Sequence, residues 1–420
     1  MTSKYAGYLE AKITPEKVEA LRKRIGKERP VSDSLPFNSV AHPDTMRHFA
    51  FGVSEDNPLY TDEAYAAETR WGGLIASPFY QSTLGRPDLV LNPGQTLRRL
   101  RDPLRSIHVF VSGQETEFFR PVRPGDELYR RNWLHGVETK RSQFTGTISV
   151  HATRRSVARN QKGEPVSMSN SLAIHTERET AASKGKYSEH VRPHYTPEDV
   201  ERIDAAYGNE YVRGAEPRYW EDVNVGDELP EMVRGPLLVL DVIGMHVATS
   251  QGLWPMKLAY KHRRRSPGYF IPNEFGFPDV TQRCHWDDAW AQAIGNPYAY
   301  DYAVMRENWL ATYLTNWMGD DAWLWKFRCE MRRFNYIGDT QWFYGRVVKK
   351  YQTDEGTSAV DVEMWGQNQT GEVTCPGTAS ILLPSREKGL PALPTPPEDI
   401  RIAAAKGREY VDAASYLNDE

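Results

Sequence analysis

The stretch that decides the fold reads Tyr302-Ala303-Val304-Met305-Arg306-Glu307-Asn308-Trp309-Leu310-Ala311-Thr312-Tyr313-Leu314-Thr315-Asn316-Trp317. It predicts a helix with apolar or aromatic side chains on nearly every face, in which only Arg306 and Glu307 are charged. A helix that is apolar all round must be enclosed by other parts of the protein. Four segments after it have the composition of strands, and we expect them to wrap the helix as a curved antiparallel sheet: 324–333, 341–350, 358–366 and 378–384.

The sequence contains the same pattern twice. The motif Tyr60-Thr61-Asp62-Glu63-Ala64-Tyr65-Ala66 recurs as His285-Trp286-Asp287-Asp288-Ala289-Trp290-Ala291. Downstream, Glu117-x-x-Arg120-x-x-x-x-Gly125-Asp126 returns as Glu330-x-x-Arg333-x-x-x-x-Gly338-Asp339. Elements that recur in the same order indicate a duplicated domain. Because the first position is Tyr60 in one copy and His285 in the other, we expect only one half to keep the chemistry.

Composition places the chain among ordinary soluble globular proteins. It has 420 residues, of which 40% are hydrophobic and 26% are charged, and its formal net charge is −4 at pH 7. That balance gives no general reason to expect binding to nucleic acid or to a membrane surface. No apolar run approaches the length of a membrane-spanning helix, and the three isolated cysteines rule out a disulfide framework. We expect a cytoplasmic protein.

The repeats divide the chain into two predicted domains. The N-terminal domain covers residues 1–180, with strands expected near 107–119, 127–137, 143–155 and 166–176. A linker with a short helix covers 181–210, and the second domain covers 211–385. Residues 386–420 are predicted to be a Pro-rich and helical tail that is peripheral to both domains.

The residues around the two motifs resemble a known family. Asp56-Asn57-Pro58-Leu59-Tyr60-x-Asp62, followed by Trp71-Gly72-Gly73-x-Ile75-Ala76, is similar to the N-terminal half of MaoC-like dehydratases, which are two-domain relatives of R-specific (type-2) enoyl-CoA hydratases. His285-x-Asp287, Gly295 and Thr315-Asn316-Trp317-x-Gly319 keep the spacing of the catalytic half. The resemblance covers most of residues 40–385. It implies an α+β double hot-dog fold, in which each hot-dog domain is a curved antiparallel sheet wrapped around a central helix.

The resemblance also implies a reaction, the reversible hydration of a 2-enoyl thioester, usually on CoA, without a metal or redox cofactor. A water must be activated and a proton delivered to Cα, which an Asp/His pair that shares one water can do. The developing enolate oxygen needs a fixed donor, which this family supplies from a backbone N–H at the N-terminus of the buried helix. Family members place the Asp five residues before the His, with Asn-Pro between them.

Neither half of this chain satisfies that pattern. In the first half, Glu55 stands at the Asp position and Tyr60 at the His position. Tyrosine, with an ordinary pKa of about 10, is a poor base near neutral pH. We therefore expect the N-terminal half to be a non-catalytic partner of the C-terminal half.

The second half keeps His285 but has Val280 at the Asp position. An insertion of about 28 residues, long for a compact loop, separates the usual approach to the Asp from the histidine. Three acids could take the place of the missing Asp: Asp279, Glu274 and Asp301. We favour Asp279, because a bulge can absorb the one extra residue before His285. The same residue is explained equally well as part of a turn, since it follows Pro278.

His285 has two interpretations. A single histidine is more often structural than catalytic, but its place in the motif favours catalysis here. We expect the backbone N–H of Ala303 or Tyr302 to be the donor to the enolate oxygen. Asp287 is expected to order the helix that follows His285.

Substrate-binding residues are predicted in and after the insertion. Arg263, Arg264 and Arg265 could hold the phosphates of CoA or form a solvated surface run. Asp301 and Trp286 are expected beside the substrate. Other aromatic residues either line an acyl pocket or pack in the core: Trp254, Tyr269, Phe270, Phe275 and Phe277. A metal site at Cys284-His285-x-Asp287-Asp288 is disfavoured, because the paired spacing of zinc sites is missing.

These patterns predict an enzyme that hydrates a 2-enoyl-CoA, or dehydrates a 3-hydroxyacyl-CoA, with R specificity in a degradative acyl-CoA pathway. His285 would activate the water, Asp279 would share proton transfer, and the Tyr302/Ala303 amide would bind the thioester oxygen. We expect a homodimer or a higher homo-oligomer, and neither a nucleic acid nor a membrane as partner. Two other functions stay open, namely a catalytically degenerate thioester-binding or assembly subunit, and a lyase or isomerase of a different substrate.

Overall fold

A single large sheet organises the molecule, which is seen here as a computed structural model that describes residues 11–95, 102–104, 107–141, 147–177, 190–249 and 255–418. Its strands lie in the order β1-β4-β5-β6-β3-β10-β13-β12-β11-β7. The first five come from the N-terminal half: β1 (Arg86–Pro87), β3 (His108–Phe118), β4 (Leu128–Arg141), β5 (Ile148–Asn160) and β6 (Pro165–Thr176). The other five come from the C-terminal half: β7 (Glu228–Arg234), β10 (Trp323–Glu330), β11 (Gln341–Gln352), β12 (Ser358–Asn368) and β13 (Val373–Leu382).

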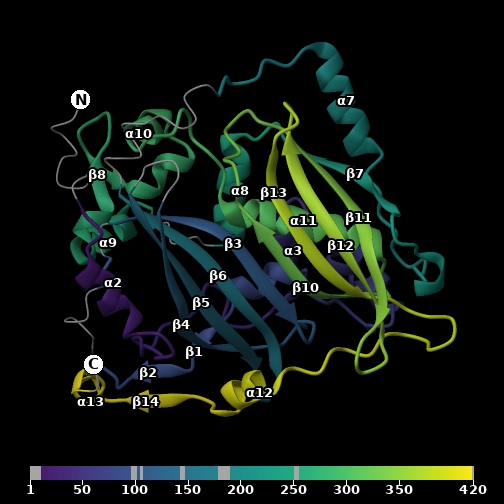
Figure 1. The fold of residues 1–420 in the computed structure, drawn as a ribbon, viewed down its shortest axis with the longest axis horizontal. Helices are drawn as coiled ribbons and strands as arrows, with labels where there is room; N and C mark the ends of the chain where they lie inside the picture. Colours follow the sequence, from purple (N-terminus) through teal and green to yellow (C-terminus); the bar gives the residue numbers. More distant parts are fainter. Residues whose placement is uncertain are drawn as a thin grey trace.

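The two half-sheets join edge to edge through β3 and β10. These strands pair antiparallel, with Lys326 opposite Glu117 and Cys329 opposite Gln114. Figure 1 shows the blue strands of the N-terminal half continuing into the green and yellow strands of the C-terminal half. Because β3 and β10 carry the repeated Glu-x-x-Arg segments at their ends, the duplication seen in the sequence is also the join of the structure.

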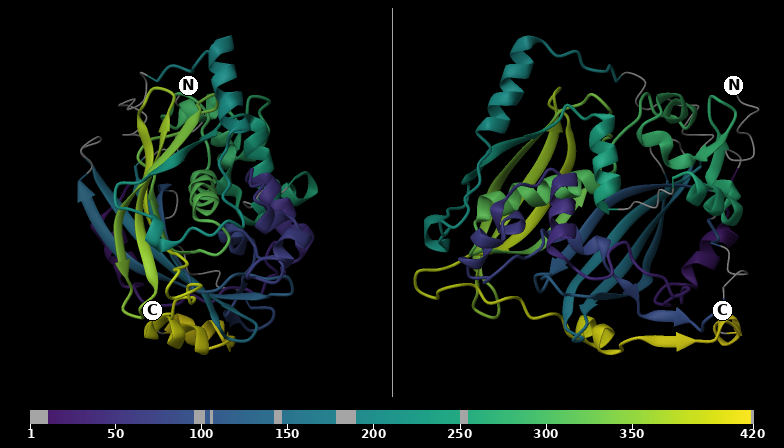
Figure 2. Two further views of the ribbon diagram at one scale, coloured as in Figure 1. Left: turned by 90° about the vertical axis from the view of Figure 1, so that its right-hand side faces the viewer. Right: turned by 180° about the vertical axis from the view of Figure 1, so that it is seen from behind.

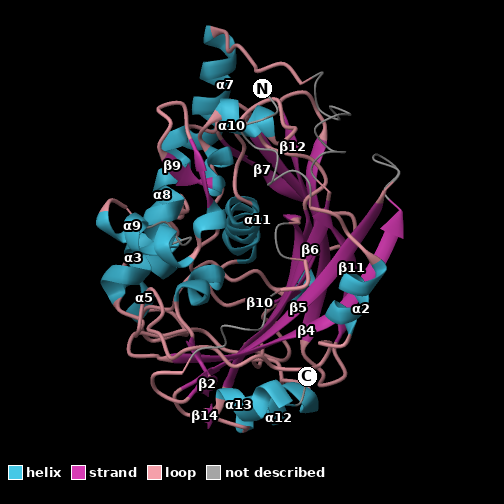
Figure 3. Cartoon of the chain, turned by 90° about the vertical axis from the view of Figure 1, so that its left-hand side faces the viewer, coloured by secondary structure: helices cyan, strands magenta, loops and turns pink. Residues whose placement is uncertain are grey.

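The C-terminal half encloses the predicted central helix. α11 (Ala303–Met318) is buried at every residue from Met305 to Met318. The strands around it bury apolar side chains: Phe343, Val347, Val360, Val362, Met364 and Ile381. Figure 3 shows α11 end-on, with the sheet on one side and α3 (Pro43–Gly52) and α8 (Val239–Thr249) on the other. This half therefore has the packing that its sequence predicted.

The N-terminal half departs from the expected architecture, because it has no long helix at the equivalent place in the described chain. The 3-10 helix η1 (Pro78–Thr83) follows Tyr60 at the same sequence distance at which α11 follows His285. It stops after two turns, since Gly85 takes a φ of +119° and Pro87 restricts the backbone that precedes it. The rest of this region is formed by α4 (Pro58–Thr61) and α5 (Glu63–Ala67).

Helices of the two halves also cross outside the sheet. α3 packs on α8, and the crossing is made at Gly52. A Cβ built on Gly52 would lie 2.4 Å from Ala248 Cβ and 2.7 Å from the carbonyl oxygen of Gly244. Only glycine therefore permits this approach of the two backbones.

Two further helices begin at threonine N-caps. The Thr14 hydroxyl accepts a hydrogen bond from the first turn of α2 (Pro15–Arg22), and Thr196 forms a capping box with Asp199 at the start of α7 (Pro197–Gly208). α7 runs along the outside of the C-terminal half, where Ile203 packs on Val233. Within the described residues, no helix combines the length and apolar character that crossing a bilayer requires.

The insertion in the C-terminal half forms a small subdomain. Its described elements are α9 (Lys257–Arg265), η3 (Pro267–Tyr269), β8 (Phe270–Pro272), β9 (Pro278–Val280) and η4 (Thr281–His285), followed by α10 (Asp288–Ala293). β8 and β9 pair antiparallel as a short hairpin, with Ile271 opposite Asp279. The hairpin delivers the chain to His285 at the end of η4.

The C-terminal tail packs along the outside of the N-terminal half. Figure 2 shows it crossing from the C-terminal half along one side of the N-terminal half. α12 (Glu398–Ala405) buries Ile400 against Phe119 and Val157, and α13 (Ala413–Asn418) ends the described chain. β14 (Glu409–Val411) pairs in parallel with β2 (Leu89–Leu91). The apolar face of α12 thus has a partner that is far away in the sequence.

Candidate active site

His285 is held in one tautomer. Its Nδ1 lies 2.8 Å from the carbonyl oxygen of Tyr300, and a carbonyl can only accept a hydrogen bond, so Nδ1 carries the proton. Burial lowers the pKa of His285 to about 4, although the carbonyls of Tyr300 and Asp301 act in the opposite direction. The ring is therefore neutral at pH 7, and its Nε2 is unprotonated and able to accept a proton.

Aromatic rings surround His285. Its ring stacks on Tyr302 with 3.6 Å between centroids, and the edge of Tyr300 lies at 4.9 Å. His246 of α8 contacts the other side of Tyr302 at 4.8 Å and Trp286 at 5.8 Å. Burial lowers the pKa of His246 to about 4 as well. Two neutral imidazoles thus share one aromatic environment beside the start of α11.

The N-terminus of α11 offers backbone donors. Tyr302 is the N-cap residue in extended conformation, and its side chain makes no capping hydrogen bond. The N–H groups of the first turn of a helix have no partner within the helix, and the helix dipole favours negative charge there. The first helical N–H belongs to Ala303, so the structure puts this predicted donor at the uncapped end of a buried helix, next to the stacked His285 and Tyr302.

The structure does not bring Asp279 or Glu274 into contact with His285. The Asp279 carboxylate accepts hydrogen bonds from its own neighbour Val280, at 2.7 Å, and from Asn273, at 3.5 Å. Both partners belong to the hairpin and its turn. These contacts favour the interpretation of Asp279 as a turn residue. Glu274 is exposed at the turn itself.

Asp301 is an ion-pair partner inside the protein. Its carboxylate lies 2.8 Å from Arg306 Nε and accepts a hydrogen bond from Asn335 Nδ2 at 3.3 Å. Burial raises the pKa of Asp301 to about 6, while the guanidinium acts to lower it. With 2% of its surface exposed, this carboxylate joins α11 to the sheet and has little access to a substrate.

The other predicted positions separate into two groups. Asp287 accepts hydrogen bonds from Trp290 N at the start of α10 and from Arg283, so it orders that helix as expected. Trp286 is partly buried against His246. Most of the residues of the insertion that were predicted to bind CoA or line an acyl pocket are exposed on its surface: Arg264, Arg265, Phe275 and Phe277. Arg263 and Tyr269 are partly buried, and Phe270 is buried. Trp254 lies outside the described residues.

A cavity of about 600 Å³ reaches the same helix end from the N-terminal half. Val304 and Glu307 of α11 form part of its wall, and η1 and α2 form another part. Burial raises the pKa of Glu307 to about 7, and Arg306 only partly offsets the shift. Sequence reasoning did not select Glu307, although a carboxylate in a helix that is apolar all round was a signal of function.

Comparisons with known proteins bear on the fold. Residues 37–169 match the FAS1-like dehydratase domain region. The UPF0336 protein Rv0504c of Mycobacterium tuberculosis is 26% identical over 152 residues, which are 36% of this chain and 81% of that protein. A solved structure described as a MaoC-like dehydratase has a TM-score of 0.58 at 18% identity, over 86% of this chain and 99% of that chain. This chain has a double hot-dog fold.

The motif around Tyr60 in the N-terminal half packs against α11. Glu55 accepts a hydrogen bond from the Thr312 hydroxyl at 2.7 Å and is 4% exposed. Tyr60, at the position equivalent to His285, is 4% exposed, and burial raises the pKa of its hydroxyl. The Asn57 side-chain amide donates a hydrogen bond to Asn316 Oδ1 at 3.3 Å. These contacts join the two halves.

The described residues contain no cluster of three or more His, Cys, Asp or Glu side chains that could hold a metal ion. Cys284, Cys329 and Cys375 are buried thiols that form no disulfide with one another. The groups gathered at the start of α11 are imidazoles, aromatic rings and the carboxyls of Asp301 and Glu307, which suit proton transfer.

Proposed function

We propose that this protein catalyses the hydration of a 2-enoyl-CoA, or the reverse dehydration of a 3-hydroxyacyl-CoA, with R specificity. The observation that carries the proposal is the neutral His285, whose protonated Nδ1 points to the Tyr300 carbonyl at the uncapped start of α11. A base with a fixed tautomer beside backbone donors suits the addition of water to an unsaturated thioester.

The chemistry assigns one role to each group. His285 Nε2 accepts a proton from water as the water oxygen bonds to Cβ. The negative charge that develops on the thioester oxygen is stabilised by the Ala303 N–H and the helix dipole. An acid of the protein then delivers its proton to Cα. The imidazolium returns its proton to solvent, and the carboxylate left by the acid takes up a proton from solvent. The reverse sequence eliminates water.

We assign proton delivery to Glu307. It lines the cavity together with Val304, one turn into the helix, and its pKa of about 7 keeps a large share of the carboxyl groups protonated at neutral pH. The carboxylate of Asp279, favoured from sequence, bonds to its own hairpin, and Asp301 is ion-paired. Asp279 as the acid stays a prediction that its Asn variant tests.

The experiment is direct. Purified protein is mixed with 2-enoyl-CoAs of different chain length, and absorbance of the conjugated thioester is followed, with chiral analysis of the 3-hydroxyacyl product. We expect the absorbance to fall and the product to be the R isomer. An unchanged absorbance for every substrate, with CoA esters still bound, would favour a binding subunit without catalysis. That second function is consistent with the lack of a carboxylate touching His285 among the described residues.

A further inference from the structure

The cavity of the N-terminal half has polar side chains on its sheet wall, where a hot-dog domain usually packs its helix. The inward side chains of its strands include Gln114 of β3, Ser156 of β5, and Ser169 and Ser171 of β6. In the C-terminal half the corresponding sheet face is apolar and filled by α11. Apolar residues such as Phe79 and Leu134 also line this cavity of about 600 Å³, so it suits a ligand that has both an apolar part and a polar group.

Arg130 of β4 is the unusual cation of this cavity. Its guanidinium donates to the carbonyls of Leu84, at 3.2 Å, and Gln81, at 2.5 Å, and to the Ser156 hydroxyl, at 3.4 Å. No described residue offers it a carboxylate, and burial lowers the pKa of Arg130 to about 10. The three contacts use one hydrogen on each nitrogen, so one N–H on each terminal nitrogen is left.

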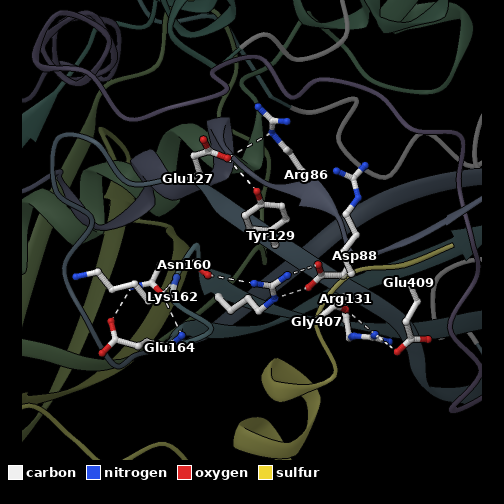
Figure 4. Close-up of polar contacts among 12 residues, drawn as sticks. Arg86, Asp88, Glu127, Tyr129, Arg131, Asn160, Lys162, Glu164, Gly407 and Glu409 are labelled. Atoms are coloured by element: carbon white, nitrogen blue, oxygen red, sulfur yellow. Dashed lines mark hydrogen bonds and ion pairs between the residues drawn. The ribbon is translucent and has the colours of Figure 1, made fainter.

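Neighbouring arginines have acidic partners. Arg131 binds Glu28 at 2.6 Å and Glu409 of the tail at 2.5 Å, and Figure 4 shows its contacts with Glu409 and the Gly407 carbonyl. Arg154 and Arg155 lie 3.8 Å and 3.7 Å from aspartates. These cations have acidic partners, whereas no carboxylate of the described residues pairs with Arg130, and the difference points to an anion supplied from outside.

The backbone at Gly85 lies close to the Arg130 guanidinium. A Cβ at Gly85 would lie 2.3 Å from Arg130 Nε, and Gly85 has a φ of +119°. The Gly85 position thus lets the chain pass close to Arg130, whose fork is fixed by the adjacent carbonyls of η1 and Leu84. A fork with two remaining N–H groups matches the two oxygens of a carboxylate.

We propose that Arg130 binds a carboxylate at the far end of the acyl chain, so that the substrates are CoA thioesters of dicarboxylic acids. This inference rests on the proposed function, because it places the thioester at α11 and the acyl chain in the cavity that Val304 and Arg130 both line. Ser156 and Gln114 then lie in the same cavity wall as the bound acid. Fatty-acyl chains that end in methyl would leave the buried guanidinium without an anionic partner.

The test measures binding apart from turnover. Isothermal titration compares saturated succinyl-, glutaryl- and adipyl-CoA with butyryl-, valeryl- and hexanoyl-CoA, which share the thioester but lack the terminal acid. Wild type is compared with Arg130→Met and Arg130→Lys. The control is Arg346→Met, which changes an exposed strand arginine paired with Glu363. Circular dichroism and thermal melts establish that each variant is folded.

We expect wild type to bind at least one acid-ended thioester about 100-fold more tightly than its methyl-ended match, from two charge-assisted hydrogen bonds. Arg130→Met should abolish the preference, Arg130→Lys should keep part of it, and Arg346→Met should keep all of it. Equal binding of matched thioesters by wild type overturns the proposal. Equal weakening of both classes in Arg130→Met also overturns it, because it would place the phosphates of CoA at Arg130.

Turnover of the matching 2-enoyl-CoAs is measured in parallel. If acid-ended thioesters bind through Arg130 but no 2-enoyl-CoA is hydrated, the anion site stands and the proposed hydratase fails. If methyl-ended and acid-ended substrates are hydrated equally well, the hydratase stands and the anion site fails.

Discussion

The two halves of the molecule share one pattern of strands and differ in what fills them. The C-terminal half encloses α11, which is buried over its whole length by an apolar sheet. The N-terminal half has the short η1 in the equivalent place and a polar cavity beside it. One copy of the duplicated domain therefore supplies the central helix, and the other has a cavity where that helix would lie.

The motif loops differ in a parallel way. In the N-terminal half Glu55 and Tyr60 are packed against the middle of α11 and hold it through Thr312. In the C-terminal half His285 lies at the beginning of the same helix, among partly buried rings. A single helix is thus packed against both motifs, against one at its middle and against the other at its start.

The largest expected effect comes from substituting the first residue of each motif, which is His285 in one half and Tyr60 in the other. His285→Ala should lower kcat/KM by about 1,000-fold, in the range typical of a lost general base. Tyr60→Phe, the matched change in the other half, should leave kcat/KM within about threefold and lower stability by about 1 kcal/mol. Both are measured by loss of enoyl-thioester absorbance and by thermal melts. Full activity of a folded His285→Ala protein would remove the proposed mechanism.

Next in size are the candidate acids. Glu307→Gln keeps the shape of the side chain and should lower kcat by about 100-fold, since no proton can be delivered to Cα. Asp279→Asn should have little effect on kcat, because its carboxylate bonds to the hairpin. Comparing kcat of the two variants under saturating substrate decides between them. Loss of activity only in Asp279→Asn would identify Asp279, and not Glu307, as the acid that delivers the proton.

The pH dependence of hydration should reflect both groups. His285 must be neutral, and its pKa of about 4 means that activity falls as the pH drops through that value rather than near 6.5. Glu307 must be protonated, so activity falls about tenfold per unit as the pH rises above its pKa of about 7. A profile of kcat/KM from about pH 3 to 9 tests both limbs. In Glu307→Gln the alkaline limb should disappear, and its persistence would assign that limb to another group.

A smaller effect on the free energy of unfolding is expected from enlarging side chains, and it should differ between the packed core of the C-terminal half and the cavity of the N-terminal half. Ala379→Leu enlarges a side chain that is 4% exposed inside the C-terminal half, and should lower the free energy of unfolding by about 1–3 kcal/mol. Ser171→Leu makes a change of volume of about the same size in the wall of the cavity, and should cost less than about 0.5 kcal/mol. Urea unfolding of both variants makes the comparison. Equal losses would mean that the N-terminal half is packed as tightly as the C-terminal half.

The smallest predicted effect concerns the crossing of α3 and α8. Gly52→Ala should destabilise the protein by about 1 kcal/mol or more, because the new Cβ meets Ala248 Cβ at 2.4 Å. Gly244→Ala in the facing helix is the control, since its Cβ meets only Gly52 O at 3.7 Å. Helix propensity should make that change neutral or stabilising by up to about 1 kcal/mol. Thermal melts that show the same loss for both would place the close approach elsewhere.

Much of the fold followed from local pattern. The helix expected over 302–317 is α11 at 303–318, and the strand expected over 358–366 is β12 at 358–368. Buried and partly buried residues alternate along most of β12, which is why periodicity identified it. β5 was predicted to end at 155 but continues to Asn160. Its polar residues Arg154, Arg155 and Ser156 look like a strand end, yet Arg154 and Ser156 face a polar cavity.

Some residues of the candidate site could likewise be selected from the sequence, and others could not. His285 was selected because it stands at the first position of a repeated motif, and Ala303 because the family resemblance implies a donor at the start of the buried helix. The structure puts His285 beside the start of α11. The missing acid was sought near His285 in sequence, where Asp279 turned out to bond to its own hairpin. Glu307 lies 22 residues after His285 in the sequence, and only the folded helix turns it into the cavity.

By itself the sequence determined that the chain is duplicated, that α11 is buried, and that only one motif carries a histidine, because repeats and periodicity are properties of neighbouring residues. The tertiary structure decided that the N-terminal half is hollow, that Arg130 has no carboxylate partner in the described chain, and that Glu307 lines the same space. These features arise from residues far apart in the sequence, and burial and charge pairing exist only after the chain has brought them together.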